Sequence, residues 1–127
     1  MNKAFLNFNL ATKLQRIGIP NASGFYYKKS GNRKDKDVYS SKEIFTGMTN
    51  FDSVYTPAYL SYDLEAVMPA GINSKGDVYS FAVRKTKDKY DARYENEKGH
   101  VIYREYSESS VEAKAKMILF LKKHKYI

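Results

Sequence analysis

The stretch from Val78 to Ile127 constrains the fold more than any other part of the chain, because three strand patterns lead directly into a helix pattern. Residues 78–84 and 90–94 alternate apolar with polar side chains, and residues 100–106 are rich in β-branched and aromatic types. A period of two marks strands with one apolar face, and such residue types suit a pleated surface. The connections are short, which favours antiparallel pairing, since parallel strands need a long crossover. The sequence therefore predicts an antiparallel meander.

The next residues predict a helix that covers the apolar face of this meander. Ser109 and Glu112 have the spacing of a capping box, in which side chains satisfy N–H groups that the first turn leaves free. The residues that follow place apolar side chains on one helical face: Val111, Ala115, Ile118 and Leu119, widened by Met117 and Leu121. The same spacing assigns four lysines to the solvent side: Lys114, Lys116, Lys122 and Lys123.

The first half of the chain carries shorter patterns. Asn9 is the expected N-cap of a helix bearing Leu10, Leu14 and Ile17, which Gly18 and Pro20 end. Residues 25–29 and 37–40 are expected to form strands joined by a polar loop over residues 30–36, and residues 41–45 a helical turn. Thr56 and Pro57 have the residue types of a helix start, and Pro69 with Gly71 would close that helix.

These elements predict one α+β domain over residues 1–127, with an antiparallel sheet of roughly four or five strands packed against two or three helices. The helix near the C-terminus is one of them. The chain has no cysteine, so disulfides and thiolate metal sites are excluded. We find no signal-peptide pattern and no apolar run long enough for a membrane-spanning helix, so a cytoplasmic protein is expected, with no membrane partner.

Residues able to carry catalysis or bind a metal are few. His100 and His124 are the only histidines, and neither has an acidic partner at ligand spacing, so both are expected to be solvent-exposed. Four acids lie among basic residues and are interpreted as ion pairs on a solvated sheet face: Asp88, Asp91, Glu95 and Glu97. No phosphate-binding glycine loop is present. We therefore expect a protein without enzyme activity, cofactor or metal.

The formal net charge of +8 is unevenly distributed, with a basic excess over residues 28–36 and 112–125 and an acidic excess over residues 37–77. The first basic stretch adjoins two tyrosines, and the two together form a candidate binding patch: Tyr26, Tyr27, Lys28, Lys29, Arg33, Lys34 and Lys36. Aromatic rings stack on bases and cationic side chains neutralise phosphates, so nucleic acid is one candidate partner. In the competing interpretation one tyrosine belongs to the core and the basic loop is merely solvated.

A protein partner is the other candidate. The chain has 12 tyrosines and no tryptophan, and tyrosine offers a large contact area with a polar tip. The sequence favours this class narrowly, with docking on an acidic surface.

The order of elements resembles that of small orphan proteins of bacteriophages and prophages. The resemblance rests on the segment Leu14 to Pro20, the aromatic strand at Phe25, the segment Thr56 to Pro69, and a closing helix with Ala113, Ala115, Ile118, Leu119 and Leu121. It implies a compact α+β fold, a mobile-element origin and the cytoplasm of a bacterial host cell, and it brings no assigned activity. The expected function is that of a basic accessory protein that binds a host or phage protein, with nucleic-acid binding as the alternative.

Overall fold

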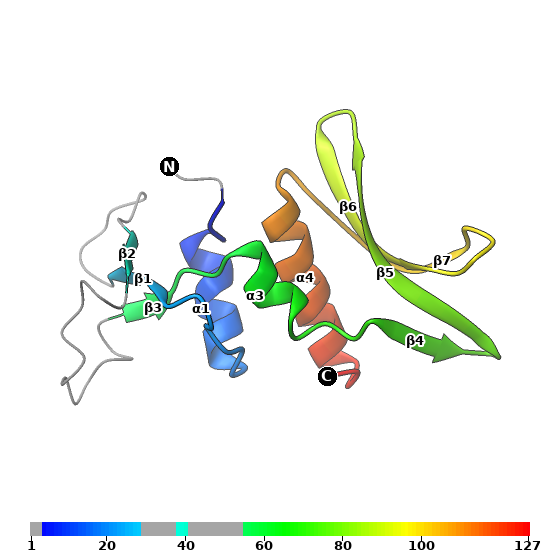
Figure 1. Ribbon diagram of the computed structural model, residues 1–127, viewed down its shortest axis with the longest axis horizontal. Helices are drawn as coiled ribbons and strands as arrows, with labels where there is room; N and C mark the ends of the chain where they lie inside the picture. Colours follow the sequence, from blue (N-terminus) through cyan, green and yellow to red (C-terminus); the bar gives the residue numbers. More distant parts are fainter. Residues whose placement is uncertain (1–3, 29–37, 41–54) are drawn as a thin grey trace. The chain divides into compact units, whose positions relative to one another are not determined.

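The computed structural model describes residues 4–28, 38–40 and 55–127, and this part of the chain has an α+β fold (Figure 1). Its helices are α1 (Phe8–Arg16), α3 (Ser61–Glu65) and α4 (Ser110–Lys123). Its strands are β1 (Phe25–Lys28), β2 (Val38–Ser40), β3 (Tyr55–Pro57), β4 (Gly71–Ser74), β5 (Asp77–Thr86), β6 (Lys89–Glu95) and β7 (Val101–Ser107). The α+β class is confirmed, and the strands of the described part divide between two antiparallel sheets rather than forming one.

The chain divides into two compact units, Met1–Asp63 and Leu64–Ile127. The first holds a sheet of order β2-β1-β3, and the second holds a sheet of order β4-β5-β6-β7. One domain over residues 1–127 stays a prediction. The loop predicted at 30–36 and the helical turn predicted at 41–45 lie outside the described residues.

Helix α1 begins and ends where local chemistry requires it. Its N-cap is Asn7, not Asn9, because the Asn7 side chain accepts a hydrogen bond from the Leu10 N–H at 2.9 Å. At the other end Gly18 has a φ of 81°, which glycine adopts without steric cost, and its N–H donates to the Gln15 carbonyl. The predicted helix and its stop signal are confirmed.

The three-stranded sheet has β1 at its centre, paired antiparallel with β2 and with β3. Tyr27 on β1 is buried, packs edge-on against Phe8 and donates its hydroxyl proton to the Leu6 carbonyl at 2.6 Å. Thr56 and Pro57 lie in β3, so the helix start predicted there is wrong. Pairing with β1 overrides the local preference, and proline is tolerated on an edge strand.

The helix predicted after Pro57 is reduced to α3, whose five residues begin at Ser61. Asp63, 2% exposed, fixes its start, because its carboxylate accepts hydrogen bonds from the N–H of Leu60 and from the N–H and hydroxyl of Ser23. Three donors on one carboxylate make Asp63 a structural residue that ties the 20–24 loop to the first turn.

The four-stranded sheet of the second unit is built from two tight hairpins and one longer loop. Lys75 and Gly76 both have positive φ, as a two-residue type I′ turn requires, and they join β4 to β5. This first hairpin pairs residues 71–74 with residues 77–80. The strands predicted at residues 78–84, 90–94 and 100–106 are confirmed.

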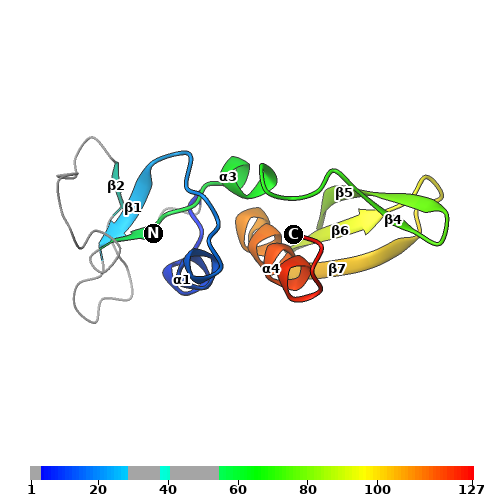
Figure 2. The same ribbon diagram turned by 90° about the horizontal axis from the view of Figure 1, so that it is seen from below.

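Helix α4 covers one face of this sheet and contacts β6 and β7. Figure 2 shows the helix nearly end-on beside these two strands. Its N-cap is Ser109, whose hydroxyl accepts from the Glu112 N–H at 3.1 Å, as the capping-box spacing predicted. Ala92 and Tyr94 of β6 are fully buried on the covered face, together with Met117, Ile118 and Leu121 of the helix. Each large apolar side chain buried in this way contributes about 1.5–3 kcal/mol to stability.

Lys114 was assigned to the solvent side of α4, and this assignment is wrong. The residue is 5% exposed, and its ammonium group forms an ion pair with Glu65 at 2.5 Å. A charge can be buried at such a position only because an opposite charge accompanies it.

Two buried tyrosines, one in each unit, give a prediction for alkaline pH. Burial raises the pKa of Tyr27 and of Tyr94 from 10.0 to about 12, since a phenolate is disfavoured away from water. The unfolded chain loses these protons first, so their contribution to stability is complete below pH 10 and is lost as pH rises towards about 12. An absorbance titration of the phenolate band should show a late step that shrinks in Tyr94→Phe. The variant Tyr62→Phe, which removes an exposed hydroxyl, should leave that step unchanged, and an unaltered step in Tyr94→Phe would contradict the assignment.

Candidate binding surface on the four-stranded sheet

The structure describes three residues of the binding patch predicted from the sequence, and they differ in exposure. Tyr27 belongs to the core, Tyr26 is half-buried with its ring edge-on to that of Tyr55, and Lys28 is exposed. Lys29, Arg33, Lys34 and Lys36 lie outside the described residues. Two members of the patch therefore remain as surface candidates within the described part of the chain.

Neither histidine lies in a cluster of potential ligands. His100 and His124 are both exposed, as expected, and the His124 ring packs on Phe120 with ring centroids 4.3 Å apart. Within residues 4–28, 38–40 and 55–127, no three histidines, aspartates or glutamates are arranged to hold a metal ion.

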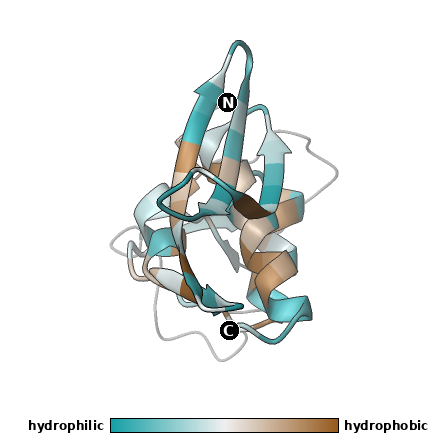
Figure 3. Ribbon diagram, turned by 90° about the vertical axis from the view of Figure 1, so that its right-hand side faces the viewer, coloured by the Kyte–Doolittle hydropathy of each residue, from teal (hydrophilic) through white to brown (hydrophobic). Residues whose placement is uncertain are grey.

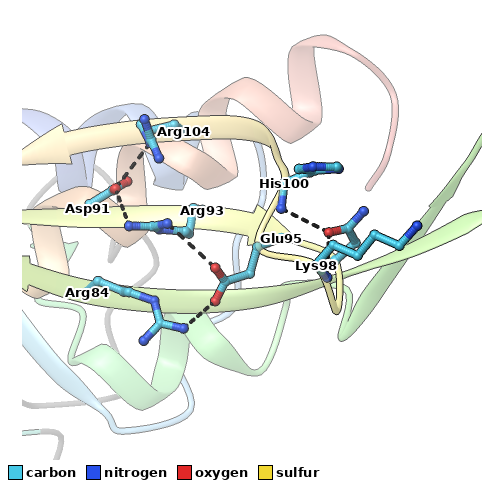
Figure 4. A network of polar contacts seen from close by, with 8 residues as sticks. Arg84, Asp91, Arg93, Glu95, Lys98, His100 and Arg104 are labelled. Carbon is cyan, nitrogen blue, oxygen red and sulfur yellow. Dashed lines mark hydrogen bonds and ion pairs between the residues drawn. The ribbon is translucent and has the colours of Figure 1, made fainter.

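A polar cluster occupies the sheet face opposite α4. The register places Arg84 of β5, Asp91, Arg93 and Glu95 of β6, and Arg104 of β7 on this outer face, since their neighbours Tyr94 and Tyr103 point to the helix side. Figure 4 shows how these side chains join three adjacent strands. We call these five residues the arginine–carboxylate network.

Ion pairs connect every member of the network. Asp91 Oδ2 lies 3.0 Å from Arg93 Nη2 and 3.1 Å from Arg104 Nε. Glu95 contacts Arg84 Nη2 at 2.7 Å and Arg93 Nη1 at 3.5 Å. Arg93 and Arg104 are directly opposite in the register, where like charges repel. Asp91 Oδ2 bridges the two guanidinium groups and so offsets this repulsion.

Asp91 is the anchor of the network and is only 1% exposed. The sequence predicts Asp88, Asp91, Glu95 and Glu97 on a solvated face, and for Asp91 this prediction is wrong. Its short side chain is enclosed by longer ones, because Arg84 and Tyr106 are its direct partners in the register and two arginines lie over it. Asp91 Oδ1 and Arg93 Nε are buried and have no hydrogen-bond partner within the described residues.

The outer members of the network face solvent. The Arg84 and Arg104 side chains are 59% and 40% exposed, whereas those of Arg93 and Glu95 are 14% exposed. Arg104 also lies 5.7 Å from the ring of Tyr106, which is 46% exposed. Three arginines meet two carboxylates, so the network has an excess positive charge. Its guanidinium groups are held in position by ion pairs yet keep N–H donors for a further acceptor.

The sequence of β6 carries a signal for this network. Asp91, Arg93 and Glu95 alternate along one strand, so their side chains must share a face. Ion pairs were expected because the acids lie among basic residues. The burial of Asp91 depends on the strands at either side and could not be derived from β6 alone.

We compared the chain with protein-family models, with curated proteins and with solved structures, and none of these comparisons finds a match. The resemblance to small phage proteins therefore stays a prediction made from the sequence. Each helix in the described part of the chain is too short or too polar to span a bilayer.

Proposed function

We propose that the chain is a non-enzymatic binding protein that docks on an acidic surface of another protein through the outer face of its four-stranded sheet. The observation that carries the proposal is the arginine–carboxylate network, with its two exposed arginines and the exposed Tyr106 beside them. As expected from the sequence, the partner would belong to a host cell or a phage.

Pre-ordering is what makes this network suited to binding. Long side chains lose rotamer freedom when they enter an interface, and that loss weakens association. Arg84 and Arg104 are already held by Glu95 and Asp91, so less freedom remains to be lost. Arginine and tyrosine are also the residue types enriched at the centres of protein interfaces.

The mixed charge of the face favours a protein partner over nucleic acid. Phosphates alone would meet Glu95 as well as the arginines, whereas a protein can place carboxylates against Arg84 and Arg104 and leave Glu95 facing a donor. Of the nucleic-acid patch predicted from the sequence, Tyr27 is buried. Nucleic-acid binding remains the alternative that the test must separate.

The test measures binding of fluorescently labelled poly-L-glutamate by anisotropy at about 0.15 M salt, where the Debye length is about 8 Å. We expect the double variant Arg84→Gln/Arg104→Gln to bind about tenfold more weakly, because it loses two exposed guanidinium groups at the network. The matched control is Lys122→Gln/Lys123→Gln, which removes the same charge from the exposed end of α4. We expect the control to bind within about twofold of the unaltered protein, since interactions with distant exposed charges are largely screened.

Two outcomes would overturn the proposal. Equal weakening in both double variants would mean that net charge rather than the sheet face attracts the probe. Tighter binding of a labelled oligothymidylate than of poly-L-glutamate, lost steeply with added salt, would favour nucleic acid instead. Circular dichroism of each variant separates loss of binding from loss of folding.

A further inference from the structure

One edge of the four-stranded sheet is only partly paired. Strand β4 pairs with residues 77–80 of β5, while β5 continues to Thr86 and pairs with β6 over residues 80–86. On the side of β5 away from β6, no strand of the described residues pairs with Val83 to Thr86. At the opposite edge, Lys116 of α4 donates a hydrogen bond to the Tyr106 carbonyl of β7. The open part of the β5 edge is therefore a place where a further strand could join this sheet.

The register shows which backbone groups point outwards there. Residues at either side of a two-residue hairpin turn exchange hydrogen bonds, so Thr86, and with it Arg84, bonds to β6. The odd-numbered residues of β5 direct their backbone N–H and C=O groups to the β4 side. The Phe81 N–H accordingly donates to the Ala70 carbonyl at 3.4 Å. The next two odd-numbered residues, Val83 and Lys85, direct their N–H and C=O groups to the open edge.

Basic side chains gather at the end of this edge and in the turn that follows it. Arg84, Lys85, Lys87 and Lys89 are all exposed, with Asp88 as the one acid among residues 84–89. The tip of the hairpin formed by β5 and β6, at the top of Figure 3, is correspondingly coloured hydrophilic. The Lys85 ammonium group lies 5.6 Å from the ring of Tyr90 on the neighbouring strand, which limits its freedom.

This charge decides which kind of strand can pair with the edge. A second copy of the chain, paired antiparallel at the same residues, would bring Arg84 or, in the neighbouring register, Lys85 opposite its own equivalent, and like charges opposite one another destabilise a sheet. Positive charge on an open edge is a common protection against such self-pairing. An extended segment with glutamates or aspartates would instead find opposite charges and four backbone hydrogen-bonding groups.

We propose that residues 83–86 of β5 bind an acidic extended segment of the partner protein by strand addition, with backbone hydrogen bonds to Val83 and Lys85 and carboxylates against Arg84 and Lys85. This inference rests on the proposed function and adds to it the form in which the acidic partner binds. The outer-face arginines attract the partner, and the edge orders one of its segments.

The experiment uses the full chain, labelled with nitrogen-15, and a short capped peptide in which two consecutive glutamates are flanked by valines. The two glutamates are consecutive because Arg84 and Lys85 point to opposite faces of the sheet. We expect the peptide to slow hydrogen exchange of the Val83 and Lys85 amides. In an extended peptide, alternate backbone N–H groups point to opposite sides. A peptide methylated on the set of nitrogens that faces β5 should bind about tenfold more weakly, because it has the same side chains but cannot donate to β5. The peptide methylated on the other set of nitrogens is the matched control and should bind like the unmodified one.

A variant of the chain tests the backbone hydrogen bonds by changing β5 instead of the peptide. Val83→Pro removes an N–H that faces the open edge and breaks no hydrogen bond to β6, which is where proline is tolerated in a sheet. We expect about tenfold weaker peptide binding, while Val83→Ala, which keeps the N–H, binds within about threefold. Should Val83→Pro not fold, the pair of methylated peptides decides the question.

The outcomes separate this inference from the proposed function. Equal binding of all three peptides, with weakening in Arg84→Gln/Arg104→Gln, would overturn strand addition and leave the arginine–carboxylate network as the docking surface. Binding of poly-L-glutamate without binding of the short peptide would do the same. Failure of both acidic probes to bind would overturn both proposals.

Discussion

Replacing Asp91 by asparagine is expected to lower the free energy of unfolding by about 3 kcal/mol, the range seen when one partner of a buried ion pair is removed. The substitution keeps the shape of the side chain and removes its charge. Arg93 and Arg104, opposite each other in the register, would then face a neutral amide, and Arg93 is too buried to regain water. Urea denaturation monitored by circular dichroism measures the loss.

The matched control is Asp88→Asn, the same chemical change in the exposed turn between β5 and β6. We expect it to alter stability by less than about 0.5 kcal/mol, as surface substitutions usually do. The deficit of Asp91→Asn should persist at high salt, because a buried pair is screened far less than an exposed one. A loss below about 1 kcal/mol, or one that disappears with salt, would mean that water reaches the network and screens it.

The elements that the sequence predicted correctly are those determined by residues close together in the sequence. Ser109 and Glu112 mark the start of α4 through a local hydrogen bond, and Gly18 marks the end of α1 through its own φ. The alternation in β5 and β6 likewise fixes which side chains share a face. Each of these features needs only a few consecutive residues, so no knowledge of distant parts of the chain is required.

Features that depend on distant residues were missed. The helix periodicity places Lys114 towards solvent, but Glu65 lies 49 positions earlier in the sequence and forms an ion pair with it. Thr56 and Pro57 have the chemistry of a helix start, yet β1 supplies a strand partner for them. In both positions a contact made only after folding outweighs a local preference worth about 1 kcal/mol or less.

The candidate site follows the same division. Ion pairing among Asp91, Arg93 and Glu95 could be expected from their spacing, because alternate residues of a strand share a face. The contribution of Arg84 and Arg104 could not, since it requires the registers of two hairpins. The bulge between Tyr94 and Glu95 also shifts the register of β6 with β7. The sequence of the loop that joins these two strands does not specify that shift.

The second large effect is expected at the contact between α4 and the sheet. Leu121 is fully buried, so Leu121→Ala should lower the free energy of unfolding by about 3 kcal/mol through lost burial and the cavity left behind. The neighbouring Leu119 is partly exposed, and Leu119→Ala should cost about 1 kcal/mol, because less apolar surface leaves water there on folding. Urea denaturation of both variants measures the two losses.

The comparison of the two leucines tests how α4 is seated. The apolar spacing alone gives Leu119 a central place on the buried face and Leu121 a place at its margin, whereas the structure reverses this order. A rotation of the helix about its axis by one residue would exchange the two costs. If Leu119→Ala proves as costly as Leu121→Ala, the helix does not pack on β6 and β7 through the face that holds Met117, Ile118 and Leu121. The outer face would then lose its geometric definition, because it is the side of the sheet that α4 leaves uncovered.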